Sequence, residues 1–270
     1  MTGPAVVPFG QRLAAAMDDR GPLCVGIDPH PGLLAAWGLT DDAAGLRTFS
    51  LRVVEALAGR VAALKPQSAF FERHGSAGIA VLEEVLAAAR GTGTQVIVDA
   101  KRGDIGSTMA GYADAYLREG APLAADALTV SPYLGAGSLA PAVAAALAGG
   151  RGLFVLCLTS NPEGAAVQHA RVRADDGGAG ESVAGGIARH AAALNSAELA
   201  GGPGLGSVGL VVGATVGDAV ARLGIDLPAV RGPLLAPGVG AQGGGAAELR
   251  AVFGAARHAV LASTSRAVLG

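Results

Sequence analysis

The chain has 270 residues, 51% of them hydrophobic and only 4% aromatic, and its formal net charge is −2. This length fits one α/β barrel and is short for two enzyme domains, and an aliphatic core favours α/β layers over an all-β sandwich. The near-neutral charge, without a run of Lys or Arg, argues against a surface that binds nucleic acid or anionic lipid, so we expect one domain, residues 1–270, with a small-molecule partner.

The N-terminal segment is the first predicted element. Phe9–Met17 has helical periodicity and is expected to cover the floor of a barrel. Asp18 and Asp19 are acidic where a secretion signal would need basic residues, and no apolar stretch is long enough to span a membrane. Cys24 and Cys157 lie in apolar runs without Cys or His neighbours, which is typical of buried reduced thiols. We therefore expect a cytoplasmic protein that binds no membrane.

Eight short apolar runs alternate with Ala-rich segments of helical periodicity, which indicates repeated βα units and a parallel sheet. Eight units in this length favour a closed (β/α)8 TIM barrel over an open sheet. Two polar or Gly-rich excursions are predicted to be flexible surface loops, Glu163–Gly180 and Ala200–Ser207. The predicted strands are Leu23–Ile27, Val61–Leu64, Gln95–Val98, Ala127–Val130, Leu153–Leu158, Val208–Val212, Pro233–Leu235 and His258–Leu261. The predicted helices are Leu46–Ala58, Ile79–Arg90, Met109–Glu119, Ala140–Leu147, Val183–Leu199, Val216–Leu223 and Ala246–Phe253, and the eighth is the weakest prediction.

Charged residues follow the first three predicted strands. The active site of such a barrel lies at the carboxyl ends of the strands, where Asp28 follows the first strand, Lys65 the second, and Asp99 and Lys101 the third. Side chains alternate along a strand, so Asp99 and Lys101 point to the same side. A structural ion pair at the barrel rim is the alternative, and Asp28, which lies near two prolines, also fits turn chemistry.

The lysine content singles out two of these residues. Among the twenty basic residues only Lys65 and Lys101 are lysines, so the chain uses arginine for its other cations. Arginine keeps its proton at accessible pH, whereas a lysine ammonium is a compact donor whose pKa can be tuned. Lysine at these strand ends therefore indicates proton transfer or a required point charge. Asp104 belongs to the same charged stretch, although its position before a predicted helix also fits an N-cap.

The last two predicted strands are followed by sequences typical of an anion-binding site. The segment 236–245 is rich in glycine, and the last strand leads through Ser263 to Arg266. Glycines free backbone N–H groups to face a phosphate, and loops after strands seven and eight are the usual phosphate site of this barrel. Arg266 can bind a phosphate bidentately. A glycine-rich turn beside a surface arginine is the alternative.

Four segments, in the expected order, resemble the orotidine monophosphate decarboxylases. Asp99–Ile105 resembles the D-x-K-x-x-D-I signature, and Lys65–Glu72 looks like the K-P-x-x-A-F-(F/Y)-E stretch of the long-chain bacterial subgroup. Val212–Thr215 and Pro237–Gln242 are also similar, and the similarity covers residues 23–266. The resemblance implies a cofactor-free TIM-barrel enzyme, a homodimer, that converts orotidine 5′-monophosphate (OMP) to UMP and CO2 in pyrimidine biosynthesis.

The resemblance also implies a role for each matching catalytic residue. Lys101 would deliver a proton to C6 of the pyrimidine as CO2 departs, and Asp99 would face the substrate carboxylate. Lys65 would complete the charge network, and Asp104 would extend it into the neighbouring subunit. No metal ion is implied.

The implied substrate contacts lie on several strand ends. Asp28 would bind a ribose hydroxyl and Ser160 the amide edge of the pyrimidine, whereas Pro237, Gln242 and Arg266 would hold the phosphate. Ile105 and Thr108 would join Asp104 in the active site of the partner. The family often has glycine before the phosphate-binding arginine, and this chain has Ser265 there, so the resemblance does not assign a role in phosphate binding to the backbone at that point.

Three other functions remain open from the residues alone. A Mg²⁺-dependent sugar-phosphate decarboxylase or aldolase of the same superfamily would need an acidic residue where Lys65 stands, and a cation repels Mg²⁺. A Schiff-base aldolase would need a neutral amine, but Lys101 lies between two carboxylates. A non-catalytic nucleotide-binding barrel would have no need for two isolated lysines beside aspartates.

Overall fold

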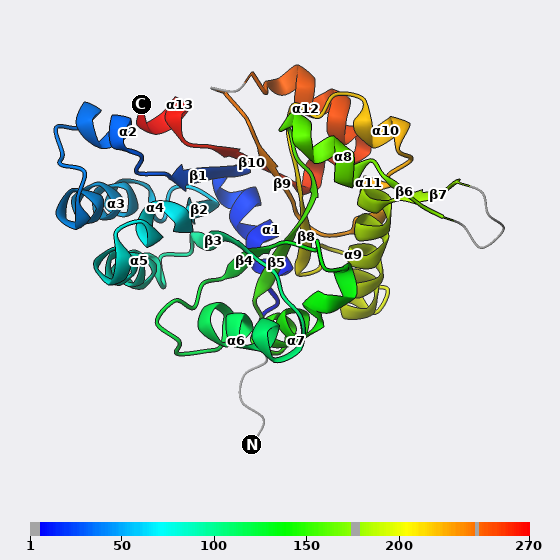
Figure 1. The fold of residues 1–270 in the computed structure, drawn as a ribbon, viewed down its shortest axis with the longest axis horizontal. Helices are drawn as coiled ribbons and strands as arrows, with labels where there is room; N and C mark the ends of the chain where they lie inside the picture. Colours follow the sequence, from blue (N-terminus) through cyan, green and yellow to red (C-terminus); the bar gives the residue numbers. More distant parts are fainter. Residues whose placement is uncertain (1–5, 174–178, 241–242) are drawn as a thin grey trace.

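Eight parallel strands close into a barrel in the computed structural model, which describes residues 6–173, 179–240 and 243–270. Around the barrel the strands follow the order β1-β10-β9-β8-β5-β4-β3-β2 (Figure 1). The barrel strands are β1 (Leu23–Ile27), β2 (Ala63–Pro66), β3 (Gln95–Arg102), β4 (Ala127–Val130), β5 (Gly152–Leu158), β8 (Val208–Val212), β9 (Leu234–Pro237) and β10 (Val260–Thr264). The prediction of a TIM barrel is confirmed.

Several barrel strands reach further toward their carboxyl ends than the apolar runs predict. β1, β4 and β8 have the predicted bounds, whereas β2 continues to Pro66, β3 to Arg102 and β10 to Thr264. The strands predicted over 61–64 and 95–98 stop where a charged residue follows, at Lys65 and at Asp99. In the structure Lys65 of β2 and Asp99 of β3 bind each other, so these charged side chains are paired where the two strands continue. Lys65, Asp99 and Lys101 thus lie within strands, whereas Asp104 lies just beyond β3.

Helices cover the outside of the barrel between successive strands (Figure 1). The longer helices are α3 (Ala43–Leu57), α5 (Gly75–Ala89), α6 (Gly106–Leu117), α7 (Ala140–Ala148), α9 (Val183–Leu199) and α12 (Ala246–Phe253). The shorter ones are α2 (Pro31–Ala36), α4 (Ser68–Glu72), α8 (Ala165–Gln168), α10 (Ala219–Arg222), α11 (Leu227–Val230) and α13 (Arg266–Leu269), with 3-10 turns η1 (Ala136–Leu139), η2 (Pro162–Gly164) and η3 (Gly254–Ala259). Across the described residues, no helix is both long and apolar enough to cross a lipid bilayer.

Two helix predictions need correction. The helix predicted over Val216–Leu223 is reduced to α10, which begins only at Ala219. Gly217 has φ 63°, a left-handed conformation that cannot belong to a right-handed helix. The weak eighth helix is the four-residue α13.

Helix α1 (Phe9–Arg20) covers the amino-terminal end of the barrel, as its sequence predicts, and it lies behind the strands in Figure 1. Phe9 and Leu13 are fully buried in a cluster with interior residues of the barrel strands. The ring of Phe9 meets the ring of Phe154 edge to face, with centroids 6.0 Å apart. This end of the barrel is therefore closed, and the other end is left for the site.

The segment Glu163–Gly180, predicted to be a flexible loop, contains regular structure in its described part. After η2 and α8, strands β6 (Arg171–Arg173) and β7 (Ala179–Ser182) pair antiparallel, and the hairpin projects from the barrel (Figure 1). Gln168 ties the segment to the end of β5 through hydrogen bonds with Thr159 of 2.9 and 2.7 Å. The other excursion, Ala200–Ser207, contains no helix or strand, but the prediction of a surface loop is wrong for its last part, where Leu205 and Ser207 are buried.

Candidate active site

Asp99 lies between the two lysines at the carboxyl end of the barrel. Its Oδ2 accepts a hydrogen bond from the Lys65 ammonium at 2.8 Å, and its Oδ1 accepts one from the Lys101 ammonium at 2.6 Å. The side chains of Asp99 and Lys65 are only 9% and 8% exposed, whereas the Lys101 side chain is 44% exposed. The cluster therefore has a buried half, Lys65 with Asp99, and a half that faces the open mouth, Lys101.

Mutual attraction keeps the buried pair ionised. Burial lowers the pKa of Lys65, but the negative charges of Asp99 and then Asp28 outweigh burial and leave this pKa above its usual value. Burial raises the pKa of Asp99, but the charges of Lys65 and then Lys101 outweigh it and leave this pKa below its usual range. A carboxylate and an ammonium are therefore fixed side by side where water is largely excluded.

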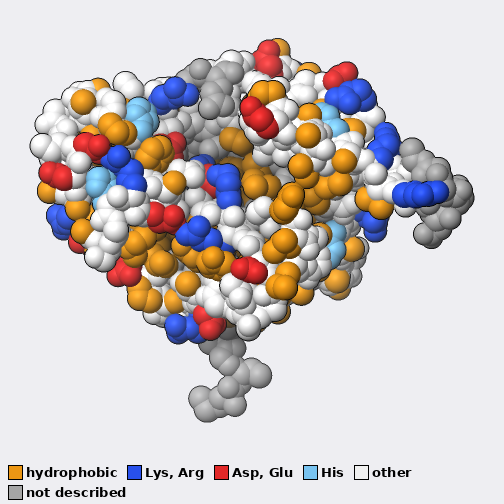
Figure 2. All heavy atoms as spheres, in the orientation of Figure 1, with side chains coloured by type: hydrophobic (Ala, Val, Ile, Leu, Met, Phe, Trp, Pro, Cys, Tyr) orange, Lys and Arg blue, Asp and Glu red, His pale blue; other side chains and the backbone are white. Residues whose placement is uncertain are grey.

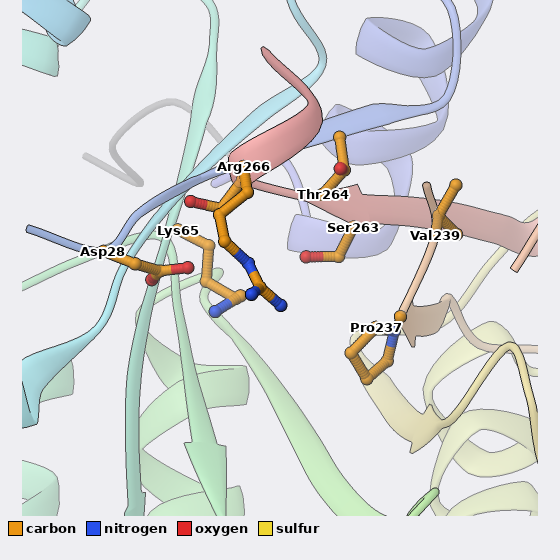
Figure 3. A pocket seen from close by; sticks show the side chains of 9 residues that line it. Asp28, Lys65, Pro237, Val239, Ser263, Thr264 and Arg266 are labelled. Carbon is orange, nitrogen blue, oxygen red and sulfur yellow. The ribbon is translucent and has the colours of Figure 1, made fainter. Parts of the chain in front are cut away.

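A pocket of about 150 Å³ opens beside this cluster, and Figure 3 shows the side chains around it. Asp28 and Lys65 form one wall, and Pro237, from the end of β9, lies opposite (Figure 3). Arg266, the first residue of α13, reaches into the pocket from the end of β10 (Figure 3). In the space-filling view, basic side chains lie at the hollow in the middle of this face (Figure 2). Two cations beside a glycine-containing turn form a suitable environment for an anion.

Several polar atoms at this pocket are buried without a hydrogen-bond partner among the described residues. They are Asp28 Oδ1, Thr264 Oγ1 and Ser265 Oγ. Buried polar atoms in native proteins nearly always have partners, so a group of such atoms in one pocket is suited to a polar ligand. Hydroxyl donors next to Arg266 fit phosphate oxygens, and a carboxylate oxygen fits a ligand hydroxyl.

The structure brings only part of the predicted site together. Lys65, Asp99 and Lys101 contact one another directly, and the pocket adds Asp28, Pro237 and Arg266 to Lys65. Among the groups described by the structure, no set of three or more His, Cys, Asp or Glu residues is arranged to hold a metal ion.

Four other predicted residues do not line this pocket: Asp104, Ile105, Thr108 and Ser160. The half-buried Asp104 accepts a hydrogen bond from the backbone of Ile105 and does not cap α6, whose N-cap residue is Ile105. Ile105 is 61% exposed and Thr108 is also exposed, so both face outward from the subunit. Ser160 is exposed just beyond the end of β5, and Gln242 lies outside the described residues.

Two residues of the cluster were not predicted. Thr129 on β4 donates a hydrogen bond from its hydroxyl to Asp99 Oδ1 at 2.8 Å, and Gln67 Oε1 lies 3.5 Å from the Lys65 ammonium. Thr129 is the one polar residue in the apolar run Ala127–Val130. A lone polar side chain in a buried strand was the available signal, because such a group needs a partner.

Comparison with known proteins gives one consistent result. A family model described as orotidine 5′-phosphate decarboxylase / HUMPS matches residues 21–270. A Streptomyces coelicolor orotidine 5′-phosphate decarboxylase is 62% identical over 263 residues, which cover 97% of this chain and 90% of that protein. The enzyme of the same name from Salinispora arenicola is 60% identical, with 97% and 89% coverage.

Solved structures agree with these sequence similarities. A Streptomyces avermitilis crystal structure carrying the same family designation superposes with a TM-score of 0.91 at 59% identity, covering 100% of this chain and 90% of the other. A Methanocaldococcus jannaschii orotidine 5′-monophosphate decarboxylase, solved with the inhibitor BMP, has a TM-score of 0.61 at 17% identity, with 92% and 90% coverage. That more distant likeness shows the shared fold alone.

Proposed function

The chain belongs to the orotidine 5′-phosphate decarboxylase / HUMPS family, and we propose that it is the decarboxylase that converts OMP to UMP and CO2 in pyrimidine biosynthesis. It is an enzyme, a carboxy-lyase. The observation that carries the proposal is the Lys65–Asp99–Lys101 cluster beside a pocket suited to phosphate. We take residues 1–270 as a single catalytic domain.

Lys101 is the proposed acid. The bond between C6 of the pyrimidine and its carboxylate carbon breaks, CO2 leaves, and the electron pair stays on C6. The Lys101 ammonium, the more exposed of the two, stabilises that charge and then gives its proton to C6, and solvent reprotonates the amine. One proton is consumed for each OMP, and UMP is the product.

Asp99 and Lys65 are proposed to set the charge around the reacting carbon. Asp99 faces the substrate carboxylate and repels it, so the bound substrate is strained relative to the transition state, from which the carboxylate charge has departed as CO2. Lys65 is buried against Asp99 and supports its negative charge. Asp28, on the same pocket wall as Lys65, binds a ribose hydroxyl.

The phosphate is proposed to bind at the ends of β9 and β10. Arg266 supplies the charge, Pro237 and the glycine-rich turn shape the wall, and Gln242 adds a side-chain donor. Support comes from the orphan hydroxyls of Thr264 and Ser265. Ser160 reads the amide edge of the pyrimidine at the end of β5.

A homodimer with shared active sites is part of the proposal. Asp104, Ile105 and Thr108 would enter the site of the partner subunit. Support comes from apolar side chains that are exposed beyond two neighbouring strands: Ile105 (61% exposed) follows β3, and Tyr133 (78%) and Leu134 (53%) follow β4. Large apolar side chains exposed at one end of two paired strands fit an interaction surface.

We propose further that the reaction needs no metal ion or organic cofactor, since Lys101 supplies the proton and the two lysines supply positive charge. A cytoplasmic location fits the two cysteines, Cys24 and Cys157, which are buried and free.

Loss of the near-ultraviolet absorbance of OMP, measured with a chelator present, tests the function. Native protein is expected to turn over OMP, and Lys101→Ala to lose activity by at least about 10²- to 10⁴-fold, the usual contribution of a general acid. Arg60→Ala is the control, because Arg60 is exposed just before β2 at the opposite end of the barrel. An inactive native protein, or a fully active Lys101→Ala protein, would contradict the proposal.

A further inference from the structure

A bulge at the end of β3 shapes the catalytic cluster. β3 and β4 pair in register at Ile97 with Ala127 and at Val98 with Leu128, but the next pair is Arg102 with Val130. Three residues, Asp99–Lys101, therefore lie opposite Thr129 alone. Lys101 has φ 47°, a left-handed conformation that costs a lysine energy. Bulges of this kind redirect side chains and need something to hold them.

Thr129 fills the place that the bulge leaves unpaired. Its hydroxyl oxygen accepts a hydrogen bond from the backbone N–H of Lys101 at 2.9 Å and donates one to Asp99 Oδ1 at 2.8 Å. The same Oδ1 accepts the hydrogen bond from the Lys101 ammonium. A closed ring results, from the Lys101 backbone through Thr129 and Asp99 to the end of the Lys101 side chain.

The strand pattern explains why this position faces the site. Side chains alternate along β4: Leu128 and Val130 pack into the outer core cluster, and Ala127 into the inner one. Thr129 has the parity of Ala127 and points into the barrel, one layer closer to the mouth. It is 1% exposed, so no bulk water is available to replace its hydrogen bonds.

We propose that Thr129 is a positioning residue of this decarboxylase: its hydroxyl holds the bulge so that Asp99 and Lys101 keep the separation and direction that the reaction needs. The inference rests on the proposed function, because it assigns a role within that reaction. Thr129 does not touch the reacting atoms, and its effect passes through Asp99 and Lys101.

Three substitutions separate the hydroxyl from the volume of the side chain. Thr129→Val keeps the shape and removes the hydroxyl, Thr129→Ser keeps the hydroxyl, and Thr129→Ala removes both. We expect kcat to fall about tenfold to a hundredfold in the Val and Ala variants, as for loss of a hydrogen bond to a charged group, with KM nearly unchanged. The Ser variant should stay within about threefold of native, since both of its hydrogen bonds remain.

The scarcity of lysine provides a second readout that does not depend on activity. Labelling with ¹⁵N-lysine gives two backbone amide signals, from Lys65 and Lys101. In Thr129→Val and Thr129→Ala, hydrogen exchange of the Lys101 amide should become at least about tenfold faster, because its acceptor is gone. The Lys65 amide, on β2 and two strands away from Thr129, is the internal control.

The outcomes are distinct. Three results would each overturn the inference. They are a native kcat in Thr129→Val, a loss of kcat in Thr129→Ser as large as in Thr129→Val, and an unchanged hydrogen-exchange rate of the Lys101 amide in the Val and Ala variants. If Thr129→Val does not fold, the Ser and Ala variants make the same comparison. If native protein does not decarboxylate OMP, the proposed function fails, and with it the role of Thr129 in that reaction, whereas the exchange data still decide whether the contact exists.

Discussion

Asp99 stabilises two positive charges, and one of them has almost no access to water. Lys65 is 6% exposed, so its ammonium depends on Asp99 and, to a smaller extent, on Asp28. A buried ion pair adds little stability compared with an apolar pair, but removal of one partner leaves an uncompensated charge. The cluster is therefore vulnerable at Asp99 in both folding and catalysis.

Asp99→Asn should reveal this dependence through pH. At pH 7 we expect the variant to be about 3–5 kcal/mol less stable than native protein, because Lys65 stays buried without its main partner. Burial then dominates and moves the folded-state pKa of Lys65 below its usual value of 10.5. At pH values between the Lys65 pKa of the folded variant and that of the unfolded chain, the unfolded chain binds more protons than the folded variant, so the stability of the variant rises with pH.

Native protein behaves in the opposite way, because the pKa of its Lys65 is raised on folding. The stability that the charged Lys65 contributes is complete below pH 10.5, the usual pKa of lysine, and is lost as the pH rises through the folded-state pKa. Urea unfolding at pH 7 and pH 10 should therefore show that the difference in stability between native protein and Asp99→Asn is smaller at pH 10. Adding Lys65→Met to Asp99→Asn is the control, and it should recover part of the stability at pH 7. A difference between native and Asp99→Asn that is independent of pH would contradict this account.

At the scale of elements, Arg102 connects the end of β3 to two helices. Its guanidinium binds Glu72 at the end of α4 and lies 3.3 Å from the hydroxyl of Tyr116 on α6. It also lies over the rings of Tyr112 and Tyr116, at 5.6 and 5.8 Å from their centroids. These contacts need a planar, multi-donor cation, so arginine and lysine are not equivalent here.

Arg102→Lys is expected to lower the free energy of unfolding by about 1–3 kcal/mol, through loss of the second hydrogen bond and of ring stacking. Because Arg102 directly follows Lys101, kcat should fall as well. Arg189→Lys is the matched control, since the Arg189–Glu181 pair is exposed and should change stability by less than about 0.5 kcal/mol. Denaturant unfolding and OMP turnover of both variants measure these effects, and equal stability losses would refute the special role of Arg102.

The arrangement of the strands explains which residues of this site could be predicted from the sequence. Lys65, Asp99 and Lys101 could be found because each follows an apolar run, and strand ends meet at one face of a barrel. The role of Thr129 could not, because it depends on a register shift between β3 and β4, which is a property of two strands together. The β6–β7 hairpin was missed for a related reason: β6 is exposed throughout and β7 (Ala179–Ser182) has no large apolar residue, so neither strand produces a periodic apolar pattern.

In the whole molecule, the contacts of α1 that stabilise the barrel and the candidate active site lie at opposite ends of the barrel. At the floor, Arg12 of α1 binds Asp126 at 2.7 Å and the carbonyl of Gly150 at 2.7 Å, so the helix fixes the segments that lead into β4 and β5. At the mouth, several polar atoms lack partners among the described residues, and Asp104 does not line the pocket of its own subunit. A complete site in this protein therefore requires a second copy, if Asp104 acts as proposed.

Subunit mixing tests this requirement directly. Lys101→Ala and Asp104→Ala homodimers should both be nearly inactive. A heterodimer of the two would have one site with both defects and one site with neither, because the twofold axis of the proposed dimer would place Asp104 of each chain in the site of the other. Random pairing of equal amounts makes half of the dimers mixed, so about a quarter of all sites should be intact and activity should return to about a quarter of the native value.

Co-expression of the two variants with different affinity tags yields the mixed dimer for assay. The matched control combines Lys101→Ala with Lys65→Ala, two defects within one cluster: Lys65 and Lys101 both bind Asp99 of their own chain, so every site in that mixture carries a defect and activity should stay absent. A purified Lys101→Ala/Asp104→Ala heterodimer without activity would show that Asp104 serves its own subunit. In that case the outward position of Ile105 and Thr108 would need an explanation other than a shared active site.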